Sequence, residues 1–343
     1  MEEINQVDKR IVDKLLIKLG YPISDQLIPL AGGANNRVFC VQINQQKLFL
    51  KKYFRHSGDD RDRLKSEFSF SKFAWEVGIR CIPQPIGYDQ ELGIALFQYI
   101  TGKPVIPMDI NEKMIEQAIQ FYLKVNQHRD LRAAKNLPFA SEAYIKISDH
   151  INCVDRRLER LQNIFSETDI DKLAIEFINQ QLKTAWLGIK NSLQSKAVKE
   201  DIIFERNIPD KHFRLSPSDF GFHNAVLNSS GELTFFDFEY AGWDDPAKMV
   251  CDFFCQPAIP IPQDYLKMFI EKISVDVQLP EELNERIFLL LPVYQIKWIC
   301  IMMNEFLPVS KERRAFANGE KIYKLKKVNQ LSKAKLALEK ILR

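Results

Sequence analysis

The stretch from residue 216 to residue 246 combines side chains that hold metal ions with side chains that normally lie in a protein core. It reads SPSDFGFHNAVLNSSGELTFFDFEYAGWDDP, with Asp219, Asn224 and Asp237 set among phenylalanines. Carboxylate and amide oxygens suit Mg²⁺, which proteins usually bind through one or two carboxylates together with substrate phosphates and water. The stretch therefore indicates a site for a divalent cation and a phosphate compound, provided that the three side chains converge.

A β-hairpin would bring these side chains together. Residues 228–231, NSSG, have the composition of a turn, and the strand-like runs AVL and LTFFDF flank them. With the turn centred there, Asn224 faces Phe235 or Phe236, and Asp237 lies beside Asn224 at the open end of the hairpin. The phenylalanines would pack beneath and hold the polar groups toward a cleft. The alternative, a surface hairpin with solvated acids, explains each residue singly but not their convergence.

The segments around this hairpin divide the chain into two parts. Up to about residue 100, helical periodicity alternates with strand-like runs, and beyond it the pattern is mainly helical. The first part is predicted to hold a helix at 5–20, strands at 38–43 and 47–53, a helix at 63–77 and two strands around a turn at 89–93. The second part is predicted to hold helices at 111–129, 141–165, 169–194, 263–307 and 321–342. We place the boundary at 99–103, which gives an N-terminal lobe of residues 1–100 and a C-terminal lobe of residues 101–343.

The spacing of the polar residues in the hairpin resembles that of a known enzyme family. Asp219-x4-Asn224, followed by Asp237-Phe238-Glu239, is similar to the catalytic loop and metal-binding triplet of the aminoglycoside phosphotransferase and choline kinase superfamily. These enzymes are small-molecule relatives of the protein kinases, and DFEYAG at 237–242 is especially similar to the choline/ethanolamine kinase branch. The resemblance implies an α+β, protein-kinase-like fold, with a small antiparallel-sheet N-lobe carrying one key helix and a larger, mainly helical C-lobe.

Four further segments resemble the same family and occur in the same order. They are LAGGANNRVFCV at 30–41 (the loop that covers the phosphates), LFLKK at 48–52 (the strand with the phosphate-binding lysine), LKSEFSFSKF at 64–73 (the helix whose glutamate pairs with it) and LFQYITGK at 96–103 (the hinge that carries the adenine). Each match is weak alone, but together with the hairpin they cover nearly the whole chain.

The resemblance implies a role for each candidate residue. Asp219 accepts or orients the proton of the acceptor, Asn224 and Asp237 bind Mg²⁺, and Glu239 supports the metal shell. ATP would be bound by Gly32, Gly33, Asn35, Asn36, Lys51, Glu67, Gln98, Tyr99 and Ile100. The two glycines suit a loop whose backbone N–H groups approach phosphate oxygens, although a plain turn would have the same composition.

The residues alone leave two of these assignments open. Lys51 and Lys52 point to opposite faces of a strand, and we choose Lys51 because it occupies the position of the family's lysine. Glu67 lies on an apolar helix face, where a carboxylate needs a cationic partner unless it reaches solvent.

The function implied is an ATP- and Mg²⁺-dependent phosphotransferase that moves the γ-phosphate to a hydroxyl group of a small metabolite. A sugar, an aminoglycoside-like compound and an amino alcohol all remain possible acceptors. Two interpretations apply to the aromatic residues Trp243, Phe253, Phe254, Tyr294 and Trp298. They form a wall that binds a quaternary ammonium group, or they pack in the core. The alternative function is a catalytically weak or silent nucleotide-binding regulator, because Pro217 stands where the family usually has a histidine.

The composition of the chain argues against nucleic-acid and membrane partners. The formal net charge is +3, which argues against a dedicated nucleic-acid-binding protein. We see no run approaching the roughly 20 apolar residues of a membrane span, and the charged N-terminus favours a cytoplasmic location without membrane partners.

Cys251 and Cys255 are interpreted as buried thiols rather than metal ligands. The lysine-rich segment 321–343 either meets an acidic partner or docks on the helical lobe by its apolar stripe. The sequence carries no signal for oligomeric state.

Overall fold

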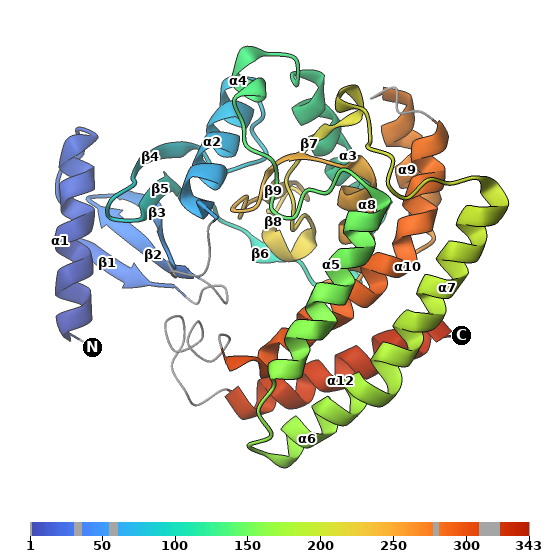
Figure 1. Ribbon diagram of the computed structural model, residues 1–343. Helices are drawn as coiled ribbons and strands as arrows, with labels where there is room; N and C mark the ends of the chain where they lie inside the picture. Colours follow the sequence, from blue (N-terminus) through green and yellow to red (C-terminus); the bar gives the residue numbers. More distant parts are fainter. Residues whose placement is uncertain (1, 31–35, 55–60, 277–280, 309–322, 343) are drawn as a thin grey trace.

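The computed structural model describes residues 2–30, 36–54, 61–276, 281–308 and 323–342, and it has two lobes (Figure 1). In the first, a five-stranded antiparallel sheet has the strand order β1-β2-β3-β5-β4. Its elements are α1 (Glu2–Lys18), β1 (Gln26–Pro29), β2 (Asn36–Ile43), β3 (Gln46–Tyr53), α2 (Arg63–Glu76), β4 (Pro85–Asp89) and β5 (Ile94–Gln98). Apart from β1, which was not predicted, these agree with the elements predicted from the sequence.

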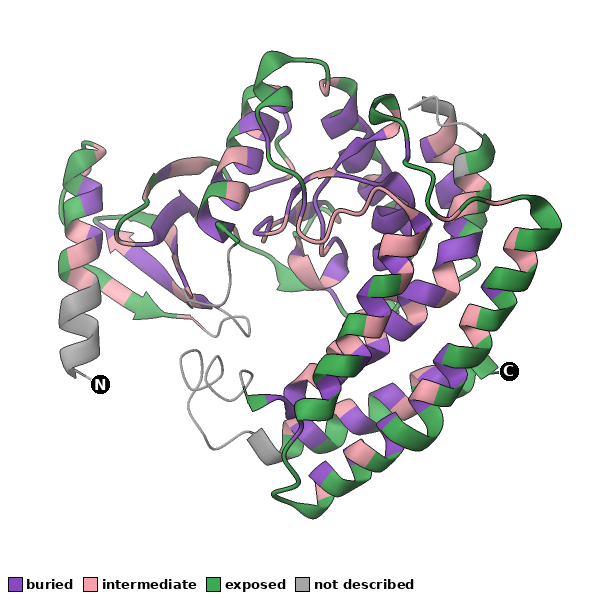
Figure 2. Ribbon diagram, in the orientation of Figure 1, coloured by how far each residue is buried: buried purple, intermediate pink, exposed green. Residues whose placement is uncertain are grey.

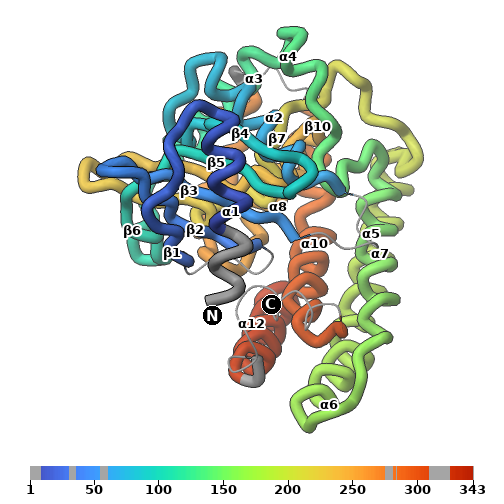
Figure 3. Tube along the Cα trace, turned by 90° about the vertical axis from the view of Figure 1, so that its left-hand side faces the viewer, coloured from blue at the N-terminus to red at the C-terminus, as the bar shows by residue number. Residues whose placement is uncertain are grey.

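The two helices of this lobe cover opposite faces of the sheet, as the alternation along β3 requires. Leu48 and Leu50 belong to a buried cluster with Leu15 and Leu16 of α1, which lies against the sheet (Figure 3). Tyr53 belongs to a second buried cluster with residues of α2. Side chains at odd-numbered positions of β3 therefore face α2, and Lys51 is among them.

The second lobe is mainly helical, with three short strand pairings around the hairpin. Its α-helices are α3 (Glu112–Gln127), α4 (Arg132–Lys135), α5 (Ile147–Arg160), α6 (Asp169–Glu176), α7 (Lys183–Glu200), α8 (Pro246–Cys255), α9 (Tyr265–Asp276), α10 (Glu281–Met303) and α12 (Tyr323–Leu342). Its strands are β6 (Lys103–Pro104), β7 (Arg214–Ser216), β8 (Ala225–Leu227), β9 (Leu233–Phe235) and β10 (Gly242–Asp244). Short 3₁₀ helices span Pro107–Asp109, Leu161–Asn163, Asp210–His212, Phe222–Asn224 and Asn304–Phe306, and a π-helical turn, Phe177–Leu182, joins α6 to α7.

Some observed helices differ in their bounds from the predicted segments, as at 169–194, where the π-helical turn separates α6 from α7 and α7 continues to Glu200. The helix expected at 141–165 begins only at Ile147, because the preceding backbone pairs with the chain after the hairpin: Ala140 N–H donates to Trp243 C=O at 2.9 Å and Ser141 N–H to Tyr240 C=O at 3.0 Å. The region 263–307 contains α9 and α10 as separate elements.

Helix α10 forms the centre of the helical lobe and packs against α8, α12 and α5 (Figure 2). By length and composition alone, the segment Asn284–Phe306 is apolar enough to cross a membrane, against our expectation that no segment approaches that size. Because 61% of its apolar window is buried inside the structure, its composition is that of a core helix. The thiols of Cys251 and Cys255, both on α8, face backbone carbonyls of α10 (Ile287 and Leu291), as expected for buried cysteines.

The C-terminal helix docks on the helical lobe, which supports the second interpretation of the lysine-rich segment. Leu331, Ala334 and Leu338 of α12 are buried, and α12 packs against α10. The predicted apolar stripe is only partly covered, because Leu325 is 67% and Val328 41% exposed.

Candidate active site

The hairpin at the site has the register predicted from the sequence. Strand β8 pairs with β9, with Ala225 opposite Phe235, and the backbone N–H of Phe236 donates to the C=O of Asn224 at 3.0 Å. The phenylalanines pack beneath it, since Phe235 and Phe238 both stack on Phe121 of α3, with ring centroids 5.1 and 5.8 Å apart. This apolar support fixes the two loops that carry the polar side chains.

Both loops have backbone in the left-handed region, where residues other than glycine rarely lie. The φ angles are 48° at Ser218, 36° at Asp219 and 67° at Asp237. Such conformations cost of the order of 1–3 kcal/mol each and cluster at functional sites. Neighbouring contacts hold them: Ser216 Oγ accepts from Ser218 N–H at 3.1 Å, and Asn224 Nδ2 donates to Asp219 C=O at 3.0 Å. The latter bond turns the amide so that Asn224 Oδ1 accepts no hydrogen bond from the described residues.

Lys51 lies at the centre of a buried cluster, which we call the lysine cluster and which contains Lys51, Glu67, Asp237 and Glu239. Its Nζ donates to Glu67 Oε2 at 2.6 Å and to Asp237 Oδ1 at 2.5 Å, and lies 3.5 Å from Glu239 Oε2. Tyr53 OH also donates to Glu67 Oε2, at 2.6 Å. Lys52, on the opposite face of β3, takes no part. The sequence left open whether Glu67 reaches solvent or has a cationic partner. The structure shows that Lys51 is its partner.

The electrostatics of the lysine cluster favour an added cation. Burial opposes the charge of Lys51, but the neighbouring carboxylates outweigh it and hold its pKa well above the usual range. Burial, opposed by Lys51 and reinforced by Glu239 and Glu67, raises the pKa of Asp237 to about 7. Ligand oxygens of Glu67, Asp237 and Glu239 all lie within 4.8 Å of one another. This donor set fits a divalent cation, because acids outnumber the ammonium.

Asn36 contacts protein groups rather than an open phosphate site. Its Nδ2 donates to Glu239 Oε2 at 2.7 Å, and its Oδ1 accepts from the backbone N–H of Phe54 at 3.2 Å. Asn36 thereby links strand β2 of the N-lobe to the triplet after the hairpin. The other predicted loop residues, Gly32, Gly33 and Asn35, lie outside the described residues.

The predicted hinge follows β5. Gln98 pairs with Leu48 of β3 and accepts from Gln84 N–H through its side chain at 3.3 Å. Tyr99 and Ile100 are half-buried, and neither has a backbone hydrogen bond within the part of the chain that the structure describes.

Asp219 faces a cavity, with 34% of its side chain exposed. His223 Nε2 lies 3.3 Å from its Oδ1. Burial favours the neutral acid, but the hydrogen bond and charge of His223, with the charge of Lys297, hold the pKa of Asp219 below its ordinary value. Sequence reasoning missed His223, although its position four residues after Asp219 was a usable signal.

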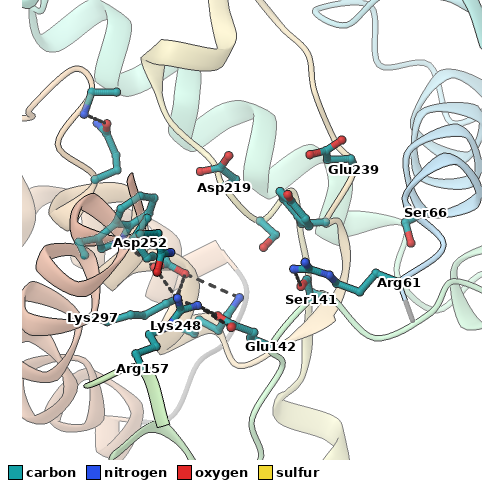
Figure 4. A pocket seen from close by; sticks show the side chains of 18 of the residues that line it. Arg61, Ser66, Ser141, Glu142, Arg157, Asp219, Glu239, Lys248, Asp252 and Lys297 are labelled. Atoms are coloured by element: carbon teal, nitrogen blue, oxygen red, sulfur yellow. Dashed lines mark hydrogen bonds and ion pairs between the residues drawn. The ribbon is translucent and has the colours of Figure 1, made fainter. Parts of the chain in front are cut away.

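The cavity has a volume of about 1160 Å³ and extends from Asp219 and Glu239 into the helical lobe. Figure 4 shows these two acids on one side and a group of charged side chains on the other. The charged side chains labelled there are Lys248, Asp252, Lys297, Glu142 and Arg157; with the fully buried Asp244, which pairs with Lys248, they form what we call the charge network. Lys297 Nζ lies 3.0 and 3.2 Å from the two oxygens of Asp252, and Arg157 Nη2 lies 2.5 and 2.6 Å from those of Glu142.

The aromatic wall considered from the sequence is not present as such. Phe253, Phe254 and Tyr294 are core residues, each at most 4% exposed, and Trp243 Nε1 donates to Ala134 C=O outside the cavity lining. Among the five candidates, only Trp298 lines the cavity. Core packing, the alternative interpretation, therefore applies to most of them.

The comparisons with known proteins agree with this geometry. A family model described as the phosphotransferase enzyme family matches residues 26–258. The fold is similar to that of a spectinomycin phosphotransferase in complex with ADP and spectinomycin, at 12% identity and a TM-score of 0.64 over 97% of both chains. It is also similar to a choline kinase from Streptococcus pneumoniae, at 13% identity and a TM-score of 0.58, over 96% of this chain and 98% of that chain. No curated protein sequence matches the chain.

Proposed function

The chain belongs to the phosphotransferase enzyme family and is a small-molecule kinase of the protein-kinase-like fold, and we propose that it transfers the γ-phosphate of ATP to a hydroxyl group with the help of Mg²⁺. One observation carries the proposal: the buried pair of Lys51 and Glu67 meets Asp237 at the end of the hairpin that also carries Asn224. A lysine and a metal-ligating acid held together are what phosphoryl transfer requires, since this chemistry depends on positioning and charge neutralisation.

In this proposal, the lysine cluster binds the phosphates. Lys51 Nζ, held by Glu67, donates to phosphate oxygens, and Tyr53 keeps Glu67 in place. Asn224 Oδ1 and the Asp237 carboxylate would hold Mg²⁺, with Glu239 supporting them. Bound there, Mg²⁺ would neutralise the charge of the phosphates.

Asp219 acts on the acceptor. Its lowered pKa keeps it ionised near neutral pH, so that it orients the acceptor hydroxyl and accepts its proton. The hydroxyl oxygen bonds to the γ-phosphorus as the bond between that phosphorus and the β–γ bridging oxygen breaks, and ADP carries the electron pair away. His223, through its contact with Asp219 Oδ1, would orient the carboxylate.

The alternative, a silent nucleotide-binding regulator, rests on Pro217 in place of a histidine. Pro217 is buried in a loop whose hydrogen bonds, from Ser218 N–H and Asn224 Nδ2, hold Asp219 in its left-handed conformation. A different histidine, His223, contacts Asp219. Both observations favour an active enzyme.

ADP release from ATP, measured over a panel of hydroxylated acceptors with and without Mg²⁺, tests the function. We expect release that requires Mg²⁺, rises with at least one acceptor and is lost in Asp219→Asn. Binding of ATP without transfer to any acceptor and without slow hydrolysis would favour the silent regulator.

A further inference from the structure

The charge network has no surplus of either sign. Its three cations, Lys248, Lys297 and Arg157, are matched by three carboxylates, Asp244, Asp252 and Glu142. Lys248 Nζ donates to Asp244 Oδ2 at 2.5 Å and also lies 3.7 Å from Asp252 Oδ2. A charged acceptor group placed beside this network would have to take a partner away from a buried pair, which is unfavourable.

Two aromatic rings at or near the cavity already face cations of the protein itself. Arg61 and Arg63 lie over the ring of Tyr240, at 5.4 and 5.5 Å from its centroid, and Lys297 lies over Tyr294 at 4.5 Å. A ring that already faces a cation offers little to a second one. The described rings that line the cavity are those of Phe139, Tyr240 and Trp298, so two of them are left for a trimethylammonium group.

The same cavity is rich in hydrogen-bonding groups. Buried polar atoms of lining residues include Arg157 Nε, a donor, and Gln330 Oε1, an acceptor, and neither has a hydrogen-bond partner among the described residues. Buried polar atoms normally find a partner. A hydroxyl group both donates and accepts, so it can bridge the paired acids and cations of the lining. Trp298, half-buried and anchored by its Nε1 to Asp252 Oδ1 at 2.8 Å, adds an apolar surface.

From this balance we infer that the acceptor is an uncharged polyhydroxylated compound, such as a sugar or a cyclitol, whose reacting hydroxyl lies at Asp219. The volume of about 1160 Å³ exceeds what a two- or three-carbon alcohol fills. The inference rests on the proposed kinase function and selects among the acceptors that function leaves open.

Matched acceptors test the inference with the intact protein. Glucose, glucosamine and glucuronate share one ring and differ in charge, as do galactose, galactosamine and galacturonate; myo-inositol, choline and ethanolamine complete the panel. With ATP and Mg²⁺, we expect kcat/KM for an uncharged compound to exceed that of its charged counterparts and of both amino alcohols by about tenfold or more.

Variants of the charge network add a second readout. Lys297→Met leaves an excess carboxylate, so the ratio of kcat/KM for an amino sugar to that for its neutral parent should rise, and Glu142→Gln should raise the corresponding ratio for a uronate. These ratios do not depend on the folded fraction of each preparation. Lys267→Met removes the same charge from an exposed pair with Glu271 and should leave them unchanged. If neither network variant folds, the comparison of matched acceptors with the unaltered protein decides.

The outcomes separate this inference from the function on which it rests. The highest kcat/KM with an amino sugar, a uronate, choline or ethanolamine overturns the inference and leaves the kinase function standing. ATP hydrolysis that no uncharged compound stimulates or inhibits also overturns it. Absence of Mg²⁺-dependent nucleotide binding and of all ADP release rejects the kinase function, and the inference with it.

Discussion

The lysine cluster and the charge network lie at opposite ends of one site and balance their charges differently. In the cluster, the carboxylates of Glu67, Asp237 and Glu239 surround the ammonium of Lys51, and they outnumber the cations even when nearby Arg63 is counted. In the network, each cation has its carboxylate. The excess negative charge of the lysine cluster suits the binding of a metal ion together with phosphates. The balanced charges of the network suit a ligand that forms hydrogen bonds and carries no charge.

The largest expected effects on ATP binding and on the transfer rate come from substitutions of two aspartates, Asp237 in the lysine cluster and Asp219 in the acceptor cavity. Asp237→Asn removes a carboxylate from the lysine cluster and should weaken Mg²⁺-dependent ATP binding. Asp219→Asn should leave that binding nearly intact and instead lower the transfer rate by about 10²–10⁴-fold, as expected for the loss of a general base. Calorimetric titration of ATP with and without Mg²⁺, together with rate measurements, separates the two. An equal loss of Mg²⁺-dependent binding in both variants would contradict the division of roles.

Two neighbouring lysines sharpen the account of the cluster. Lys51→Ala leaves its carboxylates without their ammonium and should lower turnover by about 10²–10³-fold, the range observed when a preorganised electrostatic donor is lost. Lys52→Ala is the matched control, since Lys52 lies on the other face of β3. Steady-state rates of ADP release measure both. Greater damage from Lys52→Ala would place the phosphate-binding register one residue away.

Breaking the balance of the network should affect stability. Lys297 is buried against Asp252, with 6% and 7% of their side chains exposed. Lys297→Met removes the nearest cation of Asp252 and leaves it Trp298 Nε1 and the more distant Lys248. Removal of one partner from a buried pair costs about 3–5 kcal/mol of unfolding free energy. Lys267→Met, at an exposed pair, should change the free energy little. Urea denaturation of both variants makes the comparison, and equal stabilities would mean that solvent screens the network.

The sequence predicted the lysine cluster better than the charge network, for a physical reason. Strand alternation and hairpin register are local rules. They put Lys51 and Lys52 on opposite faces, between which the family position chose Lys51, and they bring Asn224 next to the strand that leads to Asp237. The network depends on how α5, α8 and α10 pack together, since only its contacts of Lys248 with Asp244 and Asp252 are local, whereas Asp252 and Lys297 are 45 residues apart. The aromatic candidates failed for the same reason: Phe253 and Tyr294 differ from Trp298 only in which side of their helices faces the core.

The smallest predicted effect concerns His223, which lies between the two ends. Its contact helps to hold the pKa of Asp219 below the ordinary value, so the carboxylate stays ionised to lower pH. Without the histidine, that pKa rises, and the acid limb of the kcat profile should move to higher pH in His223→Ala, with a modest change at pH 8. His223→Gln keeps a donor near Asp219 Oδ1 and should restore part of the shift. A profile from pH 4 to pH 9 on the three proteins measures it. Identical acid limbs would mean that His223 only fills space beside Gly221, where an added Cβ would come within 2.7 Å of the imidazole, and that Asp219 owes its low pKa to Lys297 and Asn224.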